Sequence, residues 1–155
     1  MSIESTWVER RPGGYADPVS EIARQASRRL SEAAASGEVA GLCGRARIEL
    51  LVMFGSAAHD DTDPNDVDLA VRFERGADGD VLGLLEALYE LTGYEGFDLL
   101  DLGRAGPVAR ERALIGVRVL HEARPGLFAR EQLSAIMERL DTDEMRRVEL
   151  ELMSR

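Results

Sequence analysis

Two short stretches, Phe54-Gly55-Ser56 and Asp66-Val67-Asp68-Leu69, decide how this chain of 155 residues is interpreted. The first stretch ends the run Ile48–Phe54, whose length and apolar character are typical of a buried strand. The second opens a segment in which apolar residues alternate, the pattern of a strand with one buried face. Because residues i and i+2 of a strand point to the same side, we expect the carboxylates of Asp66 and Asp68 to converge.

These residues suggest the binding of a metal and a phosphate. Magnesium prefers hard oxygen ligands and takes only a few carboxylates in proteins, while substrate phosphates and water complete its coordination. Gly55 lets the backbone approach a ligand closely, and the following amides and the Ser56 hydroxyl can donate to phosphate oxygens. Either feature alone is common in ordinary strands and turns. Their order, a buried strand, Gly-Ser, a short loop and Asp-x-Asp, predicts a phosphate-binding turn beside a metal site.

The rest of the chain predicts several helices and short strands. Asp17-Pro18 and the apolar period after it predict a helix over 18–36, and the glycines at 37, 41 and 44 predict an irregular connection. A single turn and a loop are expected before Asp66. The remaining predicted elements are strands over 97–102 and 117–120, helices over 79–92 and from 107 to about 115, and helical stretches over 126–140 and 142–153.

The ordered motifs resemble the signature of the polymerase-β nucleotidyltransferase superfamily, and specifically its minimal nucleotidyltransferase (MNT) branch. The resemblance continues through Phe97-Asp98-Leu99-Leu100-Asp101-Leu102 and Gly116-Val117-Arg118-Val119-Leu120, so it covers roughly residues 45 to 122. It implies an α+β, polymerase-β-like nucleotidyltransferase fold, with a small mixed sheet and helices packed on it. In that family a third acid on a neighbouring strand completes the metal site. Asp98 stands at the matching position, and Asp101, which has the opposite strand parity, is the fallback.

The loop after Ser56 departs from the family pattern. The family usually has ten residues between the serine and the first aspartate, whereas this chain has nine, and His59-Asp60 stand where Arg-Gly would be expected. A mostly neutral histidine carries less charge than arginine, and the acids Asp60, Asp61 and Asp63 repel phosphate. We therefore expect weaker triphosphate binding near neutral pH than the usual loop would give.

The resemblance implies a nucleotidyltransferase-type antitoxin that transfers AMP from ATP, with Mg²⁺, to a tyrosine hydroxyl of a HEPN ribonuclease toxin. In this interpretation Asp66, Asp68 and Asp98 are the catalytic and metal-binding residues, and Gly55 and Ser56 bind the β and γ phosphates. The altered loop favours a second hypothesis, a catalytically inactive MNT-fold module that neutralises the toxin by direct contact. A third, nucleotide transfer to a small molecule, lacks an obvious additional substrate domain.

Length, charge and cysteine content narrow the range of partners and locations. The length suits one domain, which we divide into an N-terminal arm (1–17) anchored by Trp7, a nucleotidyltransferase domain (18–125) and a C-terminal helical extension (126–155). The formal net charge of −10 argues against direct binding of nucleic acid through a general basic field. No apolar run approaches the roughly 18 residues of a membrane span, and no secretory signal is recognisable. The single cysteine, Cys43, is compatible with a reducing cytoplasm.

Other candidate sites fit the sequence less well. The acidic loop from Asp61 has Asp66 and Arg72 where an EF-hand requires glycine and glutamate. His59 and His121 have no partner at a spacing suited to zinc, and Cys43 is interpreted as a small buried hydrophobe.

The C-terminal stretch carries a narrow apolar stripe. Met145, Val148 and Leu152 recur at helical spacing after Asp141-Thr142, a plausible helix start. Packing on the parent domain is the commoner outcome for such a helix, since short terminal helices rarely persist without a docking surface. We predict nevertheless that part of it contributes to association with a partner or with a second copy, because the chain continues well past the segment that completes the sheet.

Overall fold

The computed structural model describes residues 17–154, so the predicted arm over 1–17, with Trp7, lies outside the described residues except for Asp17. Five α-helices, four strands and one 3-10 turn are described in these residues. In chain order they are α1 (Pro18–Ser36), α2 (Glu38–Arg45), β1 (Ile48–Phe54), η1 (Gly55–Ala58), β2 (Val67–Phe73), α3 (Val81–Thr92), β3 (Phe97–Asp101), α4 (Pro107–Ala113), β4 (Arg118–Glu122) and α5 (Leu127–Met153).

The strands form one mixed sheet in the order β3-β2-β1-β4. Strand β1 is antiparallel to both β2 and β4, whereas β2 and β3 are parallel and are joined through α3. A parallel pair requires such a crossover, because the chain must return to the same end of the sheet. The predicted α+β class with a small mixed sheet is confirmed.

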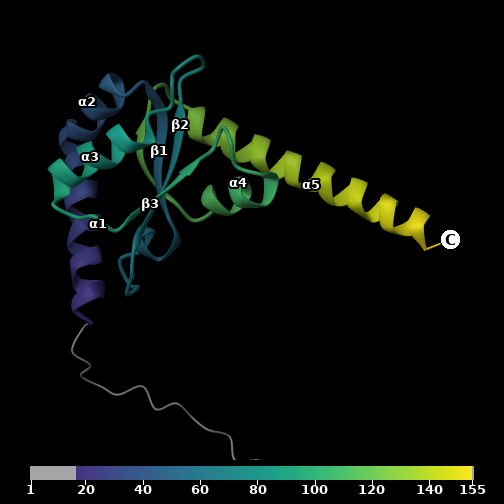
Figure 1. The fold of residues 1–155 in the computed structure, drawn as a ribbon, viewed down its shortest axis with the longest axis horizontal. Coiled ribbons are helices and arrows are strands. Elements are labelled where there is room, and N and C mark those ends of the chain that lie inside the picture. The colour runs from purple at the N-terminus through teal and green to yellow at the C-terminus, as the bar shows by residue number, and fades with distance from the viewer. Residues whose placement is uncertain (1–16, 155) are drawn as a thin grey trace, which may run out of the picture.

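Helices cover both faces of the sheet (Figure 1). The sheet therefore separates two apolar cores. Because side chains alternate along a strand, Leu51 and Met53 of β1 belong to one core, which α1, α2 and α3 cover. Leu50 and Val52 belong to the other core, together with Ala113 and Leu114 near α4 and residues of α5. Strand β1 is therefore buried on both sides, which explains its continuous apolar sequence.

Helix α1 begins and ends where the sequence predicts. The Asp17 side chain accepts a hydrogen bond from the amide of Val19 at 3.2 Å, and Pro18 occupies the first turn. Gly37 ends the helix with φ of +89°, a left-handed conformation that few other residues adopt cheaply.

The segment after Gly37 is a helix, so the predicted irregular connection is wrong. Val39, Leu42 and Cys43 lie at helical spacing in α2 and are buried against the first core. Glycine within a helix costs about 1 kcal/mol, but burying one large apolar side chain contributes about 1.5–3 kcal/mol. Burial therefore outweighs the glycines at 41 and 44. The predicted role of Cys43 as a buried hydrophobe is confirmed, and its burial raises the pKa of the thiol to about 12.

The C-terminal region is one helix, α5, so the predicted break at Asp141-Thr142 is also wrong. The Thr142 hydroxyl donates to the carbonyl of Glu138 at 2.8 Å, within the helix, instead of capping a new one. Near its start α5 is held by the buried Glu131, which accepts a hydrogen bond from Arg72 of β2 at 2.6 Å.

The outer part of α5 carries exposed apolar side chains. Met145, Val148 and Leu152 do not pack on the parent domain, so the commoner expectation for them is wrong. Their side chains are 71%, 46% and 67% exposed.

Within residues 17–154, no helix combines the length and the apolar character needed to cross a membrane.

Candidate active site

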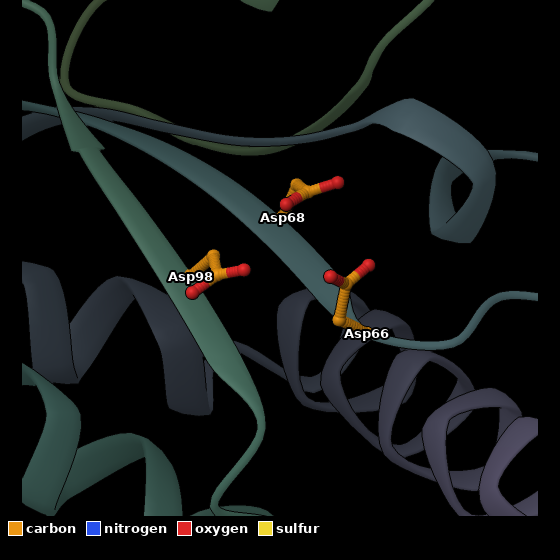
Figure 2. Close-up of side chains that lie close together, drawn as sticks. All are labelled: Asp66, Asp68 and Asp98. Atoms are coloured by element: carbon orange, nitrogen blue, oxygen red, sulfur yellow. The ribbon is translucent and has the colours of Figure 1, made fainter.

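Three carboxylates meet at one end of the parallel strand pair (Figure 2). Asp68 of β2 lies directly across from Asp98 of β3 in the strand register, and Asp66 immediately precedes β2. One oxygen from each of the three side chains lies within 4.8 Å of the others. The predicted convergence of Asp66 and Asp68 is therefore found, and Asp98 joins them.

The parity argument holds for the whole of β2. Val67, Leu69 and Val71 lie in the first core, whereas Ala70 lies in the second. Because Asp68 is two residues from Ala70, the acid faces the same side of the sheet as the second core, beyond its apolar part. The apolar part of this face stabilises the fold, and the acids occupy the end that the core leaves accessible.

Asp101, the fallback for the third acid, does not belong to this group. Its carboxylate accepts a hydrogen bond from the amide of Gly103 at 2.8 Å and lies 3.6 Å from the Arg104 guanidinium. The residue ends β3 and stabilises the turn that follows. Within the described residues, the group of carboxylates therefore favours Asp98 over Asp101.

The electrostatics of the three acids favour a bound cation. Partial burial raises the pKa of Asp68 above its usual range, and the negative charges of Asp66 and Asp98 raise it further. A group of like charges that are held together by the backbone is destabilising unless a counter-charge is supplied. A divalent cation with a preference for oxygen ligands, such as Mg²⁺, fits this donor set.

Gly55 is required by the position of Asp68. It has φ of +67°, and a Cβ atom added to it would lie 2.7 Å from a carboxylate oxygen of Asp68. Any larger residue would be strained in this conformation and would displace the acid. The glycine that sequence analysis assigned to phosphate binding thus also gives Asp68 its space.

The turn that contains Ser56 is held in place by two hydroxyl groups. Ser27 of α1 donates to the carbonyl of Ala57 at 2.9 Å, and Thr62 donates to the carbonyl of Ser56. Thr62 also donates to the carbonyl of His59 at 2.9 Å. These contacts fix η1 next to β2, while the assignment of Gly55 and Ser56 to phosphate binding remains a prediction.

Cationic side chains from distant parts of the chain contact the acidic loop. Sequence analysis missed these contacts. Arg118 of β4 donates to Asp60 at 2.9 Å and to the carbonyl of Ala58 at 3.3 Å, and Arg24 of α1 forms an ion pair with Asp63. The hydrogen bond and positive charge of Arg118 lower the pKa of Asp60. The loop is therefore less repulsive toward phosphate than its local sequence suggests, and no local signal identifies cations so far away in the chain.

Tyr94 is a second residue that sequence analysis missed. Its ring packs edge-on against Phe97 at a centroid distance of 5.1 Å, and its hydroxyl lies beside Gly96, where an added Cβ would be 2.3 Å away. Burial raises the pKa of Tyr94, and so do the charges of Asp66, Asp98 and Asp68. Tyr94 therefore lies within electrostatic range of the acidic group. An aromatic residue just before the third strand was the available signal.

The small mixed sheet, with helices on both faces and acids that converge on adjacent strands, can be compared with the folds of solved proteins. A chain of a toxin–antitoxin complex crystallised with AMP-PNP superposes with a TM-score of 0.59 at 18% identity, covering 77% of this chain and 98% of that one.

Two further complexes give the same result. A chain from the complex of a tri-AMPylated Shewanella oneidensis HEPN toxin with an MNT antitoxin matches with a TM-score of 0.57 at 16% identity, covering 83% of this chain and 99% of that one. An MntA–HepT toxin–antitoxin matches with a TM-score of 0.55 at 16% identity, over 77% and 96%. No protein-family model matches the sequence, and no curated protein does. The expected fold is thus confirmed by structural likeness.

Proposed function

We propose that this chain is a nucleotidyltransferase-type antitoxin that transfers AMP from ATP, with Mg²⁺, to a tyrosine hydroxyl of a HEPN ribonuclease toxin. The observation that carries the proposal is the convergence of Asp66, Asp68 and Asp98 on this fold. Solved structures with the same fold support it, since one was crystallised with AMP-PNP and another contains an AMPylated HEPN toxin.

The reaction exchanges one P–O bond for another, and the tyrosine hydroxyl loses its proton. The tyrosine oxygen attacks the α-phosphorus in line, the bond to the β-phosphate breaks, and pyrophosphate leaves. When bound, the metal supplies positive charge that stabilises the phosphate oxygens and lowers the pKa of the attacking hydroxyl. Asp66 and Asp68 would hold it, and Asp98 would either bind a second ion or accept the tyrosine proton. Gly55 and Ser56 would orient the β and γ phosphates.

The noncatalytic alternative, neutralisation by contact alone, rests on the altered loop. His59 replaces an expected arginine, and acids surround it. The ion pairs of Arg118 with Asp60 and Arg24 with Asp63 reduce this objection, because they bring two cations to the loop. We therefore favour the catalytic function over the contact-only module.

The test is intact-mass spectrometry of a HEPN toxin after incubation with this protein, Mg²⁺ and ATP. We expect mass increments of AMP on the toxin, and we expect Asp68→Asn to abolish them. Asp101→Asn is the matched control, since that acid lies on the same strand as Asp98 but outside the group. Adducts that persist in Asp68→Asn would exclude the proposed mechanism. Wild type that binds the toxin tightly without forming adducts would favour the contact-only module.

A further inference from the structure

A groove of about 430 Å³ is lined by residues of α3, of the turn that follows it and of the start of β3. Its lining residues are of two kinds, apolar side chains and acids. They are Leu85, Tyr89, Tyr94 and Phe97 of the first kind, and Glu86, Glu90 and Glu95 of the second. We call this surface the α3–β3 groove. The two kinds of side chain together restrict the ligands that fit it.

The aromatic side chains of the groove are held in place by the fold. Tyr94 and Phe97 pack edge to face with their ring centroids 5.1 Å apart, and both pack in the first core. Tyr89 of α3 is 48% exposed beside them. A ring that is ordered before binding loses little conformational entropy when a partner covers it, so exposed tyrosines of this kind are typical anchors of an interface.

The acids of the groove have no cation to balance them among residues 17–154. Glu86, Glu90 and Glu95 are exposed and form no ion pair with another described residue. Glu86 and Glu90 also lie one turn apart in α3, and like charges at this spacing destabilise a helix. A positively charged ligand would remove this repulsion.

The α3–β3 groove lies next to the candidate active site. Phe97 directly precedes Asp98 in β3, which is an edge strand of the sheet. One protein surface that covers this edge can therefore contact both the groove and the acids. Burial raises the pKa of Tyr94, and the charges of Asp66, Asp98 and Asp68 raise it further, so the wall of the groove lies in the negative field of the site.

We propose that the α3–β3 groove binds an arginine side chain of the protein that the candidate active site modifies, an inference that rests on the function proposed above. A guanidinium fits both kinds of lining residue, because it is planar, stacks on aromatic rings and donates several hydrogen bonds to carboxylates. An adenine base also stacks on tyrosine, but it brings no positive charge to the three glutamates. The groove thus favours acceptor proteins that carry an arginine close to the modified tyrosine.

The first test needs no toxin. The ¹⁵N-labelled protein is titrated with N-acetyl-arginine amide, and we expect NMR shift changes confined to α3 and the start of β3. N-acetyl-citrulline amide, which has the same shape but no charge, should cause no such changes. The double variant Glu86→Gln/Glu90→Gln should bind the arginine amide about tenfold more weakly. Glu32→Gln/Glu149→Gln is the matched control, since both glutamates are exposed on helices outside the groove.

Two results of this titration would overturn the proposal. One is equal binding of the arginine and citrulline amides, because the charge of the ligand would then be irrelevant. The other is binding of adenosine in the groove without binding of the arginine amide, because the tyrosines would then stack on a nucleotide base. Melting temperatures verify that the variants fold.

The second test concerns the acceptor, with calorimetric titration of a HEPN toxin in the absence of ATP. We expect Tyr89→Ala to weaken binding about tenfold and Tyr89→Phe to bind as wild type does, because the ring and not the hydroxyl stacks on the guanidinium. Unchanged binding of the toxin by Tyr89→Ala would overturn the acceptor role. Absence of AMP transfer in wild type would refute the proposed function separately, since both titrations are done without nucleotide transfer.

Discussion

At the scale of single residues, Asp68 affects both the stability of the fold and the proposed chemistry. The backbone places its carboxylate opposite Asp98 and close to Asp66, and partial burial adds to the repulsion. Because these effects raise its pKa in the folded protein, ionised Asp68 opposes folding. The opposition is fully present above the folded-state pKa and disappears as the pH falls toward the unfolded-state pKa. Function and stability therefore conflict at this residue unless a cation is bound.

We expect Asp68→Asn to raise the melting temperature in the presence of EDTA by about 1–3 °C, because it removes the repulsion among the acids. We also expect it to abolish the rise in melting temperature that Mg²⁺ produces in wild type. Differential scanning calorimetry with and without Mg²⁺ measures both effects. Asp101→Asn should retain the response to Mg²⁺, and an unchanged response in Asp68→Asn would remove this acid from the metal site.

Gly55 provides a second test at the residue scale. Gly55→Ala should cost about 1 kcal/mol of stability from its positive φ and should also displace Asp68, whose oxygen the new Cβ would approach at 2.7 Å. Gly37→Ala is the matched control, since Gly37 also has a positive φ but no atom lies within 4 Å of an added Cβ. Urea unfolding should show a loss in both variants, whereas Mg²⁺ titration should be weakened only in Gly55→Ala.

At the scale of elements, the negative charges of the loop between η1 and β2 are balanced by cations on other elements. Arg118 comes from β4 and Arg24 from α1. Their side chains contact the loop only because the tertiary fold brings β4 and α1 next to it. Ser31 of α1 accepts a hydrogen bond from Arg118 at 3.0 Å, which orients the guanidinium. The electrostatic environment of the loop therefore depends on α1 and β4 as well as on the loop's own residues.

We expect Arg118→Gln to return the pKa of Asp60 upward toward its ordinary value and to weaken ATP binding by about two- to fivefold. The lowered pKa of Asp60 in wild type stabilises the fold above the unfolded-state pKa, and this contribution is lost as the pH falls through the folded-state value. NMR titration of the carboxyl carbons measures the pKa. Arg29→Gln, which releases Glu38 instead, should leave Asp60 unchanged; an unaffected Asp60 in Arg118→Gln would contradict the ion pair.

At the scale of the whole molecule, α5 has two parts with different roles. Its first turns are tied to the body by Glu131, which is 6% exposed and contacts both Arg72 and Arg110. Beyond Thr142 every described residue of the helix is exposed. The outer part thus adds little to the stability of the monomer, and its apolar side chains are available for association.

Truncation after Leu140 should therefore leave a folded body whose melting temperature at high dilution changes by less than about 2 °C, since no buried side chain is removed. The same truncation should weaken association with a partner or with a second copy, because it removes the exposed Met145, Val148 and Leu152. Calorimetry and sedimentation together check the two outcomes. An unfolded truncation would show that the outer helix is part of the core and would contradict the division made here.

Much of the fold follows from local patterns in the sequence. The buried run of β1, the cap at Asp17, the turn at Gly55 and the alternation of β2 each depend on residues a few positions apart, and each is found where it was predicted. Two elements were mispredicted for the same reason. Glycines within α2 and Asp141-Thr142 within α5 are local signals for a break, and burial or hydrogen bonding along the helix overrides them.

For the candidate site, the sequence by itself determined that Asp66 and Asp68 lie on the same side, since strand parity is a property of the backbone alone. Family resemblance added Asp98, and only the parallel pairing of β2 with β3 put it directly across from Asp68. The approach of Arg118 to Asp60 depends on contacts between separate elements. Local sequence encodes which way a side chain points, but the register and packing of distant elements decide what it meets.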